Sequence, residues 1–232
     1  VATVRSGQRP PVRQLHDALR LRVRHHLQSY LHAQGLGDSY QVGSRPQGRH
    51  LCRIAGGAAL LTIIASMERE LSGLRREISS LRSGHDLGLA VVGIGKSQSQ
   101  AGVREILNAG SGGPPRQLLM LGFAGAVDQD LKTGDLVLSN RYHVESPGEE
   151  FLMPDPKMRQ NGMLAAANAG LATHHVDSLT VDQIVSTPAA KAALAEEHQV
   201  GIVEMEDYWL SAAAQEARVP FVSARAVLDT SQ

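Results

Sequence analysis

The stretch "VGIVEMEDYWLSAAAQEARVPFVSARAVLDT", residues 200–230, has charged side chains at the ends of apolar, strand-like segments. It reads as a short apolar strand, a helix with small apolar residues on one face, and a second apolar strand that starts at Phe221. Carboxylates follow the first strand at Glu204 and Glu206, and Asp229 ends the second strand, which also contains Arg225. Ligands of open α/β sheets bind at the carboxyl ends of the strands. We therefore expect these charged side chains to belong to a functional site.

The same alternation of strands and helices extends back to residue 59. Strand-like runs occupy residues 59–66, 87–95, 117–127 and 134–144, and helical patterns occupy residues 67–82, 96–110, 156–171 and 187–198. Strands that are apolar throughout are typical of a sheet covered on both faces by helices. The sequence therefore predicts an α/β domain over residues 59–232.

Residues 1–58 differ in charge from the rest of the chain. They contain nine arginines and two aspartates, a formal charge of +7, whereas the remainder carries −7. The apolar spacing of residues 12–33 predicts a basic amphipathic helix, and the glycines and prolines of residues 35–57 predict a linker. Such a helix is compatible with a membrane surface, a nucleic acid, a targeting peptide or a peripheral position. We interpret residues 1–58 as an N-terminal extension.

Composition excludes several classes of protein. The chain has 232 residues, of which 42% are hydrophobic and 20% charged, as in soluble globular proteins. Aromatic residues amount to only 3%, which argues against binding of nucleic acid by base stacking. No apolar run is long enough for a membrane span. The single cysteine, Cys52, excludes an internal disulfide framework and favours a reducing compartment, so we expect a cytoplasmic protein.

Common catalytic motifs are absent. "GIGKS" lacks the first glycine of a phosphate loop because Ala90 stands at that position, which leaves a possible anion site at a helix N-terminus. The histidines at 25–26 and 174–175 are adjacent pairs without the spacing of a zinc site, and we expect no metal. Polar groups instead recur where predicted strands end. These groups are Ser66, Glu68 and Glu70, residues 93–96, residues 122–125, Asp182, Glu204, Glu206 and Asp229. A single acid there is usually only a favourable first-turn residue of a helix, but the recurrence indicates a shared site.

Five segments together resemble one enzyme family. They are "TIIASMERELSGL", "VVGIGKSQSQAG", "LGFAGAVDQDLKTGDLVLS", "LTVDQIVS" and "VEMEDYWLSAAAQEARVPFVSARAVLDT". In form and order they are similar to the nucleoside phosphorylases and nucleosidases, most of all to methylthioadenosine/S-adenosylhomocysteine nucleosidases. The resemblance covers roughly residues 60–232. It implies a three-layer α/β/α sandwich around a twisted mixed sheet, a homodimer or larger homo-oligomer, and a small-molecule nucleoside as substrate, with neither a nucleic acid partner nor a cofactor.

The resemblance also implies roles for individual residues. Asp229 matches the acid that assists departure of the purine, Glu70 matches the group that orients or deprotonates water, and Arg225 matches an arginine near that nucleophile. Glu206, beside Met205, matches the glutamate that binds the ribose hydroxyls. The remaining expected substrate-binding residues are Val185, Ile184, Phe123, Ala124, Gly125 and Ser66. Breaking an N-glycosidic bond requires such acids, because positive charge develops on the sugar and negative charge on the base.

Four departures from the family pattern leave alternatives open. Phe123 replaces a small hydroxyl residue, which weakens a phosphate site, and Ile184 replaces an aromatic residue that stacks on adenine. Leu228 replaces a small polar neighbour of Asp229, and the chain stops three residues after Asp229, where we expect a truncated C-terminus. We predict acid-assisted hydrolysis of an adenosine-type, 5′-modified nucleoside. The alternatives are a phosphorylase with phosphate as co-substrate, a catalytically weak nucleoside-binding homologue, and a protein whose basic N-terminal helix carries the main function.

Overall fold

The computed structural model describes residues 52–53, 61–80, 87–108, 114–146 and 148–230. The predicted helix at residues 12–33 and most of the predicted linker lie outside the described residues. Two residues of the predicted extension are described. Cys52–Arg53 forms strand β1, which pairs antiparallel with β3 at Gly88 and Leu89. The sheet therefore begins a few residues before the predicted start of the domain.

Strands and helices alternate along most of the chain. The strands after β1 are β2 (Leu61–Ala65), β3 (Leu87–Val91), β4 (Leu118–Ala126), β5 (Leu136–Leu138), β6 (Tyr142–Val144), β7 (Thr173–His174), β8 (Ser178–Thr180), β9 (Ile202–Glu204) and β10 (Phe221–Asp229). The helices are α2 (Glu68–Ser80), α3 (Gly95–Asn108), α4 (Pro156–Asn168), α5 (Pro188–His198) and α6 (Asp207–Glu216). Each of the helices predicted at residues 67–82, 96–110, 156–171 and 187–198 is present.

The strands form a single mixed sheet that branches at β4. Its main path runs β1-β3-β2-β4-β10-β5-β7, and β9 joins the end of β4 and leads to β8 and β6. The longest pairing is parallel, between β4 and β10, and runs from Phe221 opposite Leu118 to Asp229 opposite Gly125. The predicted strand at residues 134–144 is wrong as one element: β5 pairs with β10 and β7, whereas β6 pairs with β8 on the other branch. The chain must break between them to change branches.

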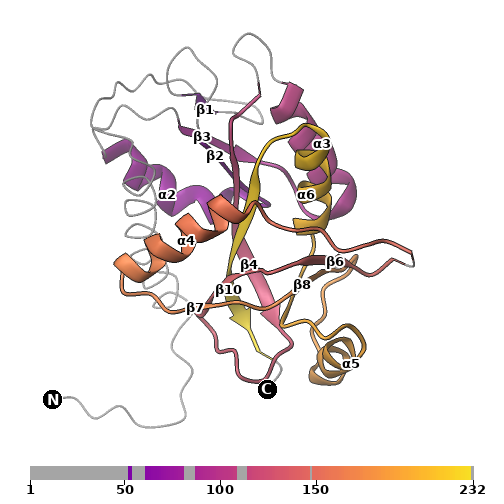
Figure 1. Cartoon of the computed structure of the whole chain (residues 1–232). Coiled ribbons are helices and arrows are strands. Elements are labelled where there is room, and N and C mark those ends of the chain that lie inside the picture. The colour runs from indigo at the N-terminus through magenta and orange to yellow at the C-terminus, as the bar shows by residue number, and fades with distance from the viewer. Residues whose placement is uncertain (1–51, 54–60, 81–86, 109–113, 147, 231–232) are drawn as a thin grey trace, which may run out of the picture.

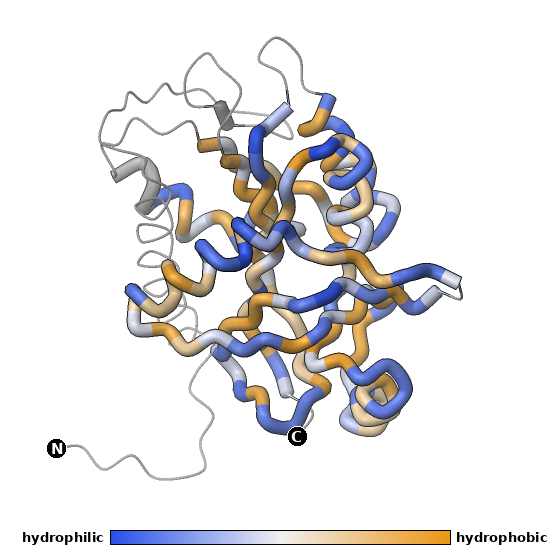
Figure 2. The backbone as a smooth tube through the Cα atoms, viewed as in Figure 1, coloured by the Kyte–Doolittle hydropathy of each residue, from blue (hydrophilic) through white to orange (hydrophobic). Residues whose placement is uncertain are grey.

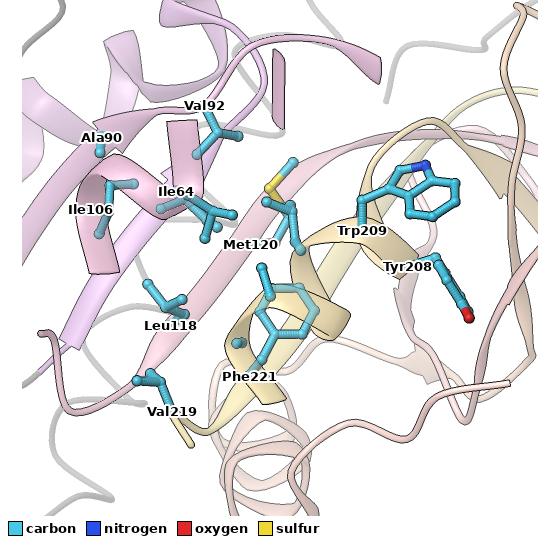
Figure 3. Packing of buried hydrophobic residues seen from close by; sticks show 14 of the residues in the cluster. Ile64, Ala90, Val92, Ile106, Leu118, Met120, Tyr208, Trp209, Val219 and Phe221 are labelled. Atoms are coloured by element: carbon cyan, nitrogen blue, oxygen red, sulfur yellow. The ribbon is translucent and has the colours of Figure 1, made fainter. Parts of the chain in front are cut away.

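Helices cover both faces of the sheet. On one face, α2 and α4 bury Leu71, Leu74 and Met158 against β2, β4 and β10. On the other face, α3 and α6 bury Val103 and Leu210. Figure 2 shows the apolar strands in the centre and hydrophilic residues on the outer helices and loops. Figure 3 shows how the second face packs, with Met120 of β4 between Ile64 of β2 and Trp209 of α6. The predicted three-layer sandwich with a twisted mixed sheet is confirmed.

The parallel strands β2, β4 and β10 direct their carboxyl ends to one edge of the sheet. Most of the sequence-predicted site residues lie at or just beyond these strand ends. Helix α5 packs near the end of β10, where Leu194 and Ala195 contact the cluster formed by Val127, Val181 and Val203. The fold thus gathers segments that are far apart in the sequence at a single edge.

Candidate active site

Arg225 is the centre of the candidate site. Its side chain is only 1% exposed, although arginine is rarely buried without partners. Nε donates to both carboxylate oxygens of Asp207 at 3.2 Å and to Ser223 Oγ at 3.3 Å. Nη2 donates to Asp207 Oδ1 at 2.5 Å, to Glu204 Oε2 at 2.9 Å and to Glu206 Oε2 at 3.2 Å. Burial alone lowers the pKa of Arg225, but the surrounding carboxylates outweigh it and raise that pKa well above its ordinary value.

Glu204 holds the start of α6 in place. Its Oε2 accepts hydrogen bonds from the backbone N–H groups of Glu206 and Asp207 at 2.7 and 2.6 Å, and its Oε1 accepts one from the Thr180 hydroxyl. The backbone N–H groups at a helix N-terminus favour such an acidic partner. Burial, and then the neighbouring charge of Asp207, raise the pKa of Glu204 to about 8 despite the opposing effect of Arg225.

Glu206 links α6 to the N-terminus of α3. Its Oε1 accepts a hydrogen bond from Gly95 N at 3.1 Å, and its Oε2 pairs with Arg225. At the "GIGKS" turn, where the sequence predicts an anion site, the Gly95 N–H is thus engaged by the side chain of Glu206. Gly95 has φ +74°, a conformation that favours glycine, and this geometry lets the turn approach Glu206.

Glu70 faces Arg225 across strand β4. It lies in the first turn of α2, where its Oε2 accepts a hydrogen bond from Met67 N at 2.8 Å. Burial raises the pKa of Glu70, while hydrogen bonds from the backbone of Met67 and Phe123 and the charge of Arg225 act in the opposite direction. A Cβ atom added to Gly122 would lie 2.6 Å from Arg225 Nη1 and 3.2 Å from Glu70 Oε1. The two side chains therefore converge over Gly122, where only glycine leaves room.

Asp229 lies further along β10 and outside this cluster. A bulge between Val227 and Asp229 shifts the strand register, so that Asp229 pairs with Gly125 of β4. Its Oδ2 accepts a hydrogen bond from Lys191 Nζ of α5 at 2.6 Å, and its side chain is 56% exposed. Among the described residues, it forms no hydrogen bond or ion pair with Glu70, Glu206 or Arg225.

The other predicted residues lie around these groups. Ser66 is 5% exposed, and its hydroxyl has no hydrogen-bond partner among the described residues. Met205 and Val185 pack on one apolar cluster, and the Met205 Cε is 4.0 Å from the Cβ position of Gly95. Ala124 is buried in the core, whereas Ile184 is 83% exposed. Phe123 participates through its backbone, since its carbonyl accepts a hydrogen bond from Arg225 Nη1 at 3.2 Å.

The structure thus pairs Glu206 with Arg225 and brings Glu70 close to Arg225 over Gly122. It places Asp229 at the end of the same strand as Arg225. Two members were not singled out from the sequence. Asp207 follows Glu206 in the motif, and its own side chain is the closest partner of Arg225. Lys191 shares a helical face with Leu194 and Ala195 at spacings of three and four residues, a pattern that could have marked it as buried.

No group of three or more His, Cys, Asp or Glu side chains able to hold a metal ion occurs among the described residues. None of the described helices combines the length and hydropathy needed to cross a membrane.

Comparisons with known proteins agree with this architecture. A family model described as "Phosphorylase superfamily" matches residues 65–232. Among solved structures, 5′-methylthioadenosine/S-adenosyl homocysteine nucleosidase from Campylobacter jejuni is 21% identical, with a TM-score of 0.67 over 75% of this chain and 87% of that chain. A futalosine hydrolase mutant from Helicobacter pylori is 17% identical, with a TM-score of 0.67 over 75% and 91% of the two chains. The Helicobacter pylori methylthioadenosine nucleosidase is 19% identical, with a TM-score of 0.68 over 76% and 88%.

Proposed function

Because this chain belongs to the phosphorylase superfamily, whose model it matches over residues 65–232, we propose that it hydrolyses the N-glycosidic bond of a purine nucleoside. The preferred substrate is an adenosine-type nucleoside with a modified 5′ position. The observation that carries the proposal is the convergence of Glu70 and Arg225 over Gly122, beside the Glu206 carboxylate.

Each acid has a task that the reaction requires. Cleavage builds positive charge on the sugar, which the neighbouring carboxylates of Glu70 and Glu206 stabilise. Glu70 has a raised pKa, caused chiefly by burial, and a base of raised pKa takes a proton from water more readily than an ordinary carboxylate does. Asp229 acts on the departing base, at the exposed end of β10. One positioned acid or base contributes about 10²- to 10⁴-fold to the rate.

Water is the proposed nucleophile because Arg225 has too few free donors for phosphate. A guanidinium has five N–H donors. Asp207, Glu204 and Glu206 engage Nε and Nη2, and the Phe123 carbonyl takes one hydrogen of Nη1. With respect to the described residues, one N–H therefore remains, whereas bidentate binding of phosphate needs two. Phe123 also offers no hydroxyl to a phosphate ion, and the surrounding carboxylates repel one.

The purine and the 5′ modification rest on the family resemblance. Two of the similar structures are nucleosidases for 5′-methylthioadenosine and S-adenosylhomocysteine, and a third is a futalosine hydrolase. Met205 and Val185 supply apolar surface for a base, and Ile184 is free to cover a ligand because it is exposed. We also propose that the enzyme is a homo-oligomer that works in the cytoplasm without a cofactor.

The test is release of free base from methylthioadenosine, S-adenosylhomocysteine, adenosine and inosine, each with and without phosphate. Release that is independent of phosphate supports the proposal. Release only with phosphate would make the protein a phosphorylase and refute the argument from Arg225. Binding of these nucleosides without release would mark a catalytically weak homologue. Deletion of residues 1–58 gives a further comparison. If the full chain binds a membrane or nucleic acid, the deletion variant does not, and neither releases base from a nucleoside, then the extension carries the main function.

A further inference from the structure

Lys191 is a buried cation whose partners, within the described part of the chain, all lie at the end of the last strand. Its side chain is 1% exposed, and lysine is almost never fully buried unless it is paired. Nζ donates to Asp229 Oδ2 at 2.6 Å, to the Thr230 carbonyl at 3.2 Å and to the Asp229 carbonyl at 3.5 Å. An ammonium group has three hydrogens, so all three are directed to this one corner of the chain.

Helix α5 fixes the position of the Lys191 backbone. Thr187 caps the helix, with its hydroxyl accepting a hydrogen bond from Ala190 N at 3.2 Å, and Pro188 follows at the first position. Leu194 and Ala195, on the same helical face as Lys191, pack against the apolar cluster that includes Val203. Lys191 is the residue of α5 that is buried, so the lysine reaches Asp229 from an anchored position.

The ion pair determines how the Asp229 carboxylate is oriented. Lys191 holds Oδ2, while Oδ1 lies over Gly125, 3.1 Å from the position that a Cβ atom would take there. Val203 and Lys191 bound the same space, each 3.4 Å from that position. The Asp229 side chain as a whole remains 56% exposed, although Lys191 holds one of its oxygens.

We propose that Lys191 is a positioning residue for Asp229. Lys191 holds one carboxylate oxygen of Asp229 and the adjoining backbone, so that the other oxygen meets the leaving base. The proposal rests on the function proposed above. Without Lys191, a half-exposed carboxylate at the end of a strand would be free to occupy several rotamers. In the acid step, the proton is carried on the oxygen that faces the base and passes to the departing base, which leaves a carboxylate that pairs with Lys191 through its other oxygen. This transfer depends on placement within hydrogen-bonding distance of the base, so its contribution of about 10²- to 10⁴-fold would largely be lost.

The test compares Lys191→Met with Asp229→Asn and with the double variant on two kinds of substrate. An ordinary purine nucleoside needs acid assistance at the base, whereas its 7-methylated counterpart already carries a positive charge on the base before the bond breaks. For the ordinary nucleoside, we expect Lys191→Met to lower kcat by about 10²-fold or more with little change in KM. With the 7-methylated nucleoside, we expect it to remain within a few-fold of the wild type.

Non-additivity gives a second readout. Because Lys191 acts through Asp229, the double variant is expected to be no slower than Asp229→Asn alone. Lys157→Met is the matched control: Lys157 lies at the exposed start of α4, and its replacement should leave both substrates unaffected. If thermal unfolding shows that Lys191→Met does not fold, Lys191→Arg replaces it, because arginine retains the positive charge on a long side chain. This variant should also lower kcat more for the ordinary nucleoside than for the 7-methylated one.

Equal losses of kcat on both nucleosides would overturn the positioning role but not the proposed function. The same holds if the losses of kcat in the two single variants multiply in the double variant. A wild-type enzyme that releases base from neither nucleoside would instead refute the proposed function, and the positioning role with it.

Discussion

Gly122→Ala tests the geometry at the centre of the site. The new Cβ would lie 2.6 Å from Arg225 Nη1, whereas nonbonded heavy atoms are stable at about 3.5–4.0 Å. The guanidinium would therefore have to move by roughly 1 Å. Its hydrogen bonds to Glu204 and Glu206 already measure 2.9 and 3.2 Å, so a displacement of this size breaks at least one of them.

The cost can be estimated from two terms. Overpacking in a core typically costs about 1–3 kcal/mol, and a hydrogen bond to a charged group contributes about 1.5–3 kcal/mol. We expect Gly122→Ala to lower the free energy of unfolding by about 2–4 kcal/mol, which in a chain of this size lowers Tm by roughly 5–15 °C. We also expect the rate of base release to fall by at least about 10²-fold, because Glu70 and Arg225 lose their relative positions.

Gly162→Ala is the matched control. Gly162 of α4 is also buried, but a Cβ there would lie 3.4 Å from Leu138 Cδ1, an ordinary contact. Alanine is favoured over glycine in a helix by about 1 kcal/mol. This variant should keep its activity and be at least as stable as the wild type. Thermal unfolding and a base-release assay on both variants provide the comparison. Wild-type Tm and rate in Gly122→Ala would refute the convergence of Glu70 and Arg225 over this residue.

Three further variants test separate features. Burial raises the folded-state pKa of Glu204 from 4.5 to about 8. The contribution of this group to the free energy of unfolding is therefore complete below pH 4.5 and is lost as the pH rises toward 8. The loss is at most roughly 1.4 kcal/mol per pH unit. Glu204→Gln, which resembles the protonated acid, should flatten the fall in unfolding free energy between pH 5 and 8, and an unchanged slope would contradict the assignment. Ser66→Ala should slow base release while leaving Tm unchanged or higher, since it removes a buried hydroxyl without a partner; unaltered kinetics would exclude a contact with substrate. Tyr142→Phe should lower the free energy of unfolding by about 1–3 kcal/mol, because the Ser223 N–H that donates to the Tyr142 hydroxyl at 2.9 Å loses its acceptor; a denaturation midpoint equal to the wild type would count against this bond.

The layered fold could be predicted from local patterns. Apolar runs such as residues 59–66 and the helical spacing of residues 67–82 depend on short stretches of sequence and on burial, and both elements appear in the structure. The break between β5 and β6 could not be predicted from local patterns, because it depends on the distant strands with which each segment pairs. Periodicity within residues 134–144 does not contain that information.

The candidate site shows the same division. Glu70, Glu206 and Asp229 were predicted to meet at one site. The structure brings Glu70 and Glu206 beside Arg225, whereas Asp229 lies outside this cluster and pairs with Lys191. Lys191 was missed because its spacing with Leu194 and Ala195 is only a weak signal in an alanine-rich helix. The partner that makes burial of the lysine favourable lies 38 residues away in the sequence. The position of Asp229 depends on a bulge in β10, and local sequence does not show which residue of a strand will bulge.

In the proposed reaction, water and not phosphate attacks the sugar in front of Glu70 and Arg225. The most direct test is the reaction of a purine nucleoside in water enriched in oxygen-18, with phosphate present, followed by mass analysis of the sugar product. We expect free sugar that carries one labelled oxygen at the former glycosidic carbon. Unlabelled sugar phosphate, formed at a rate that rises with phosphate concentration, would contradict it.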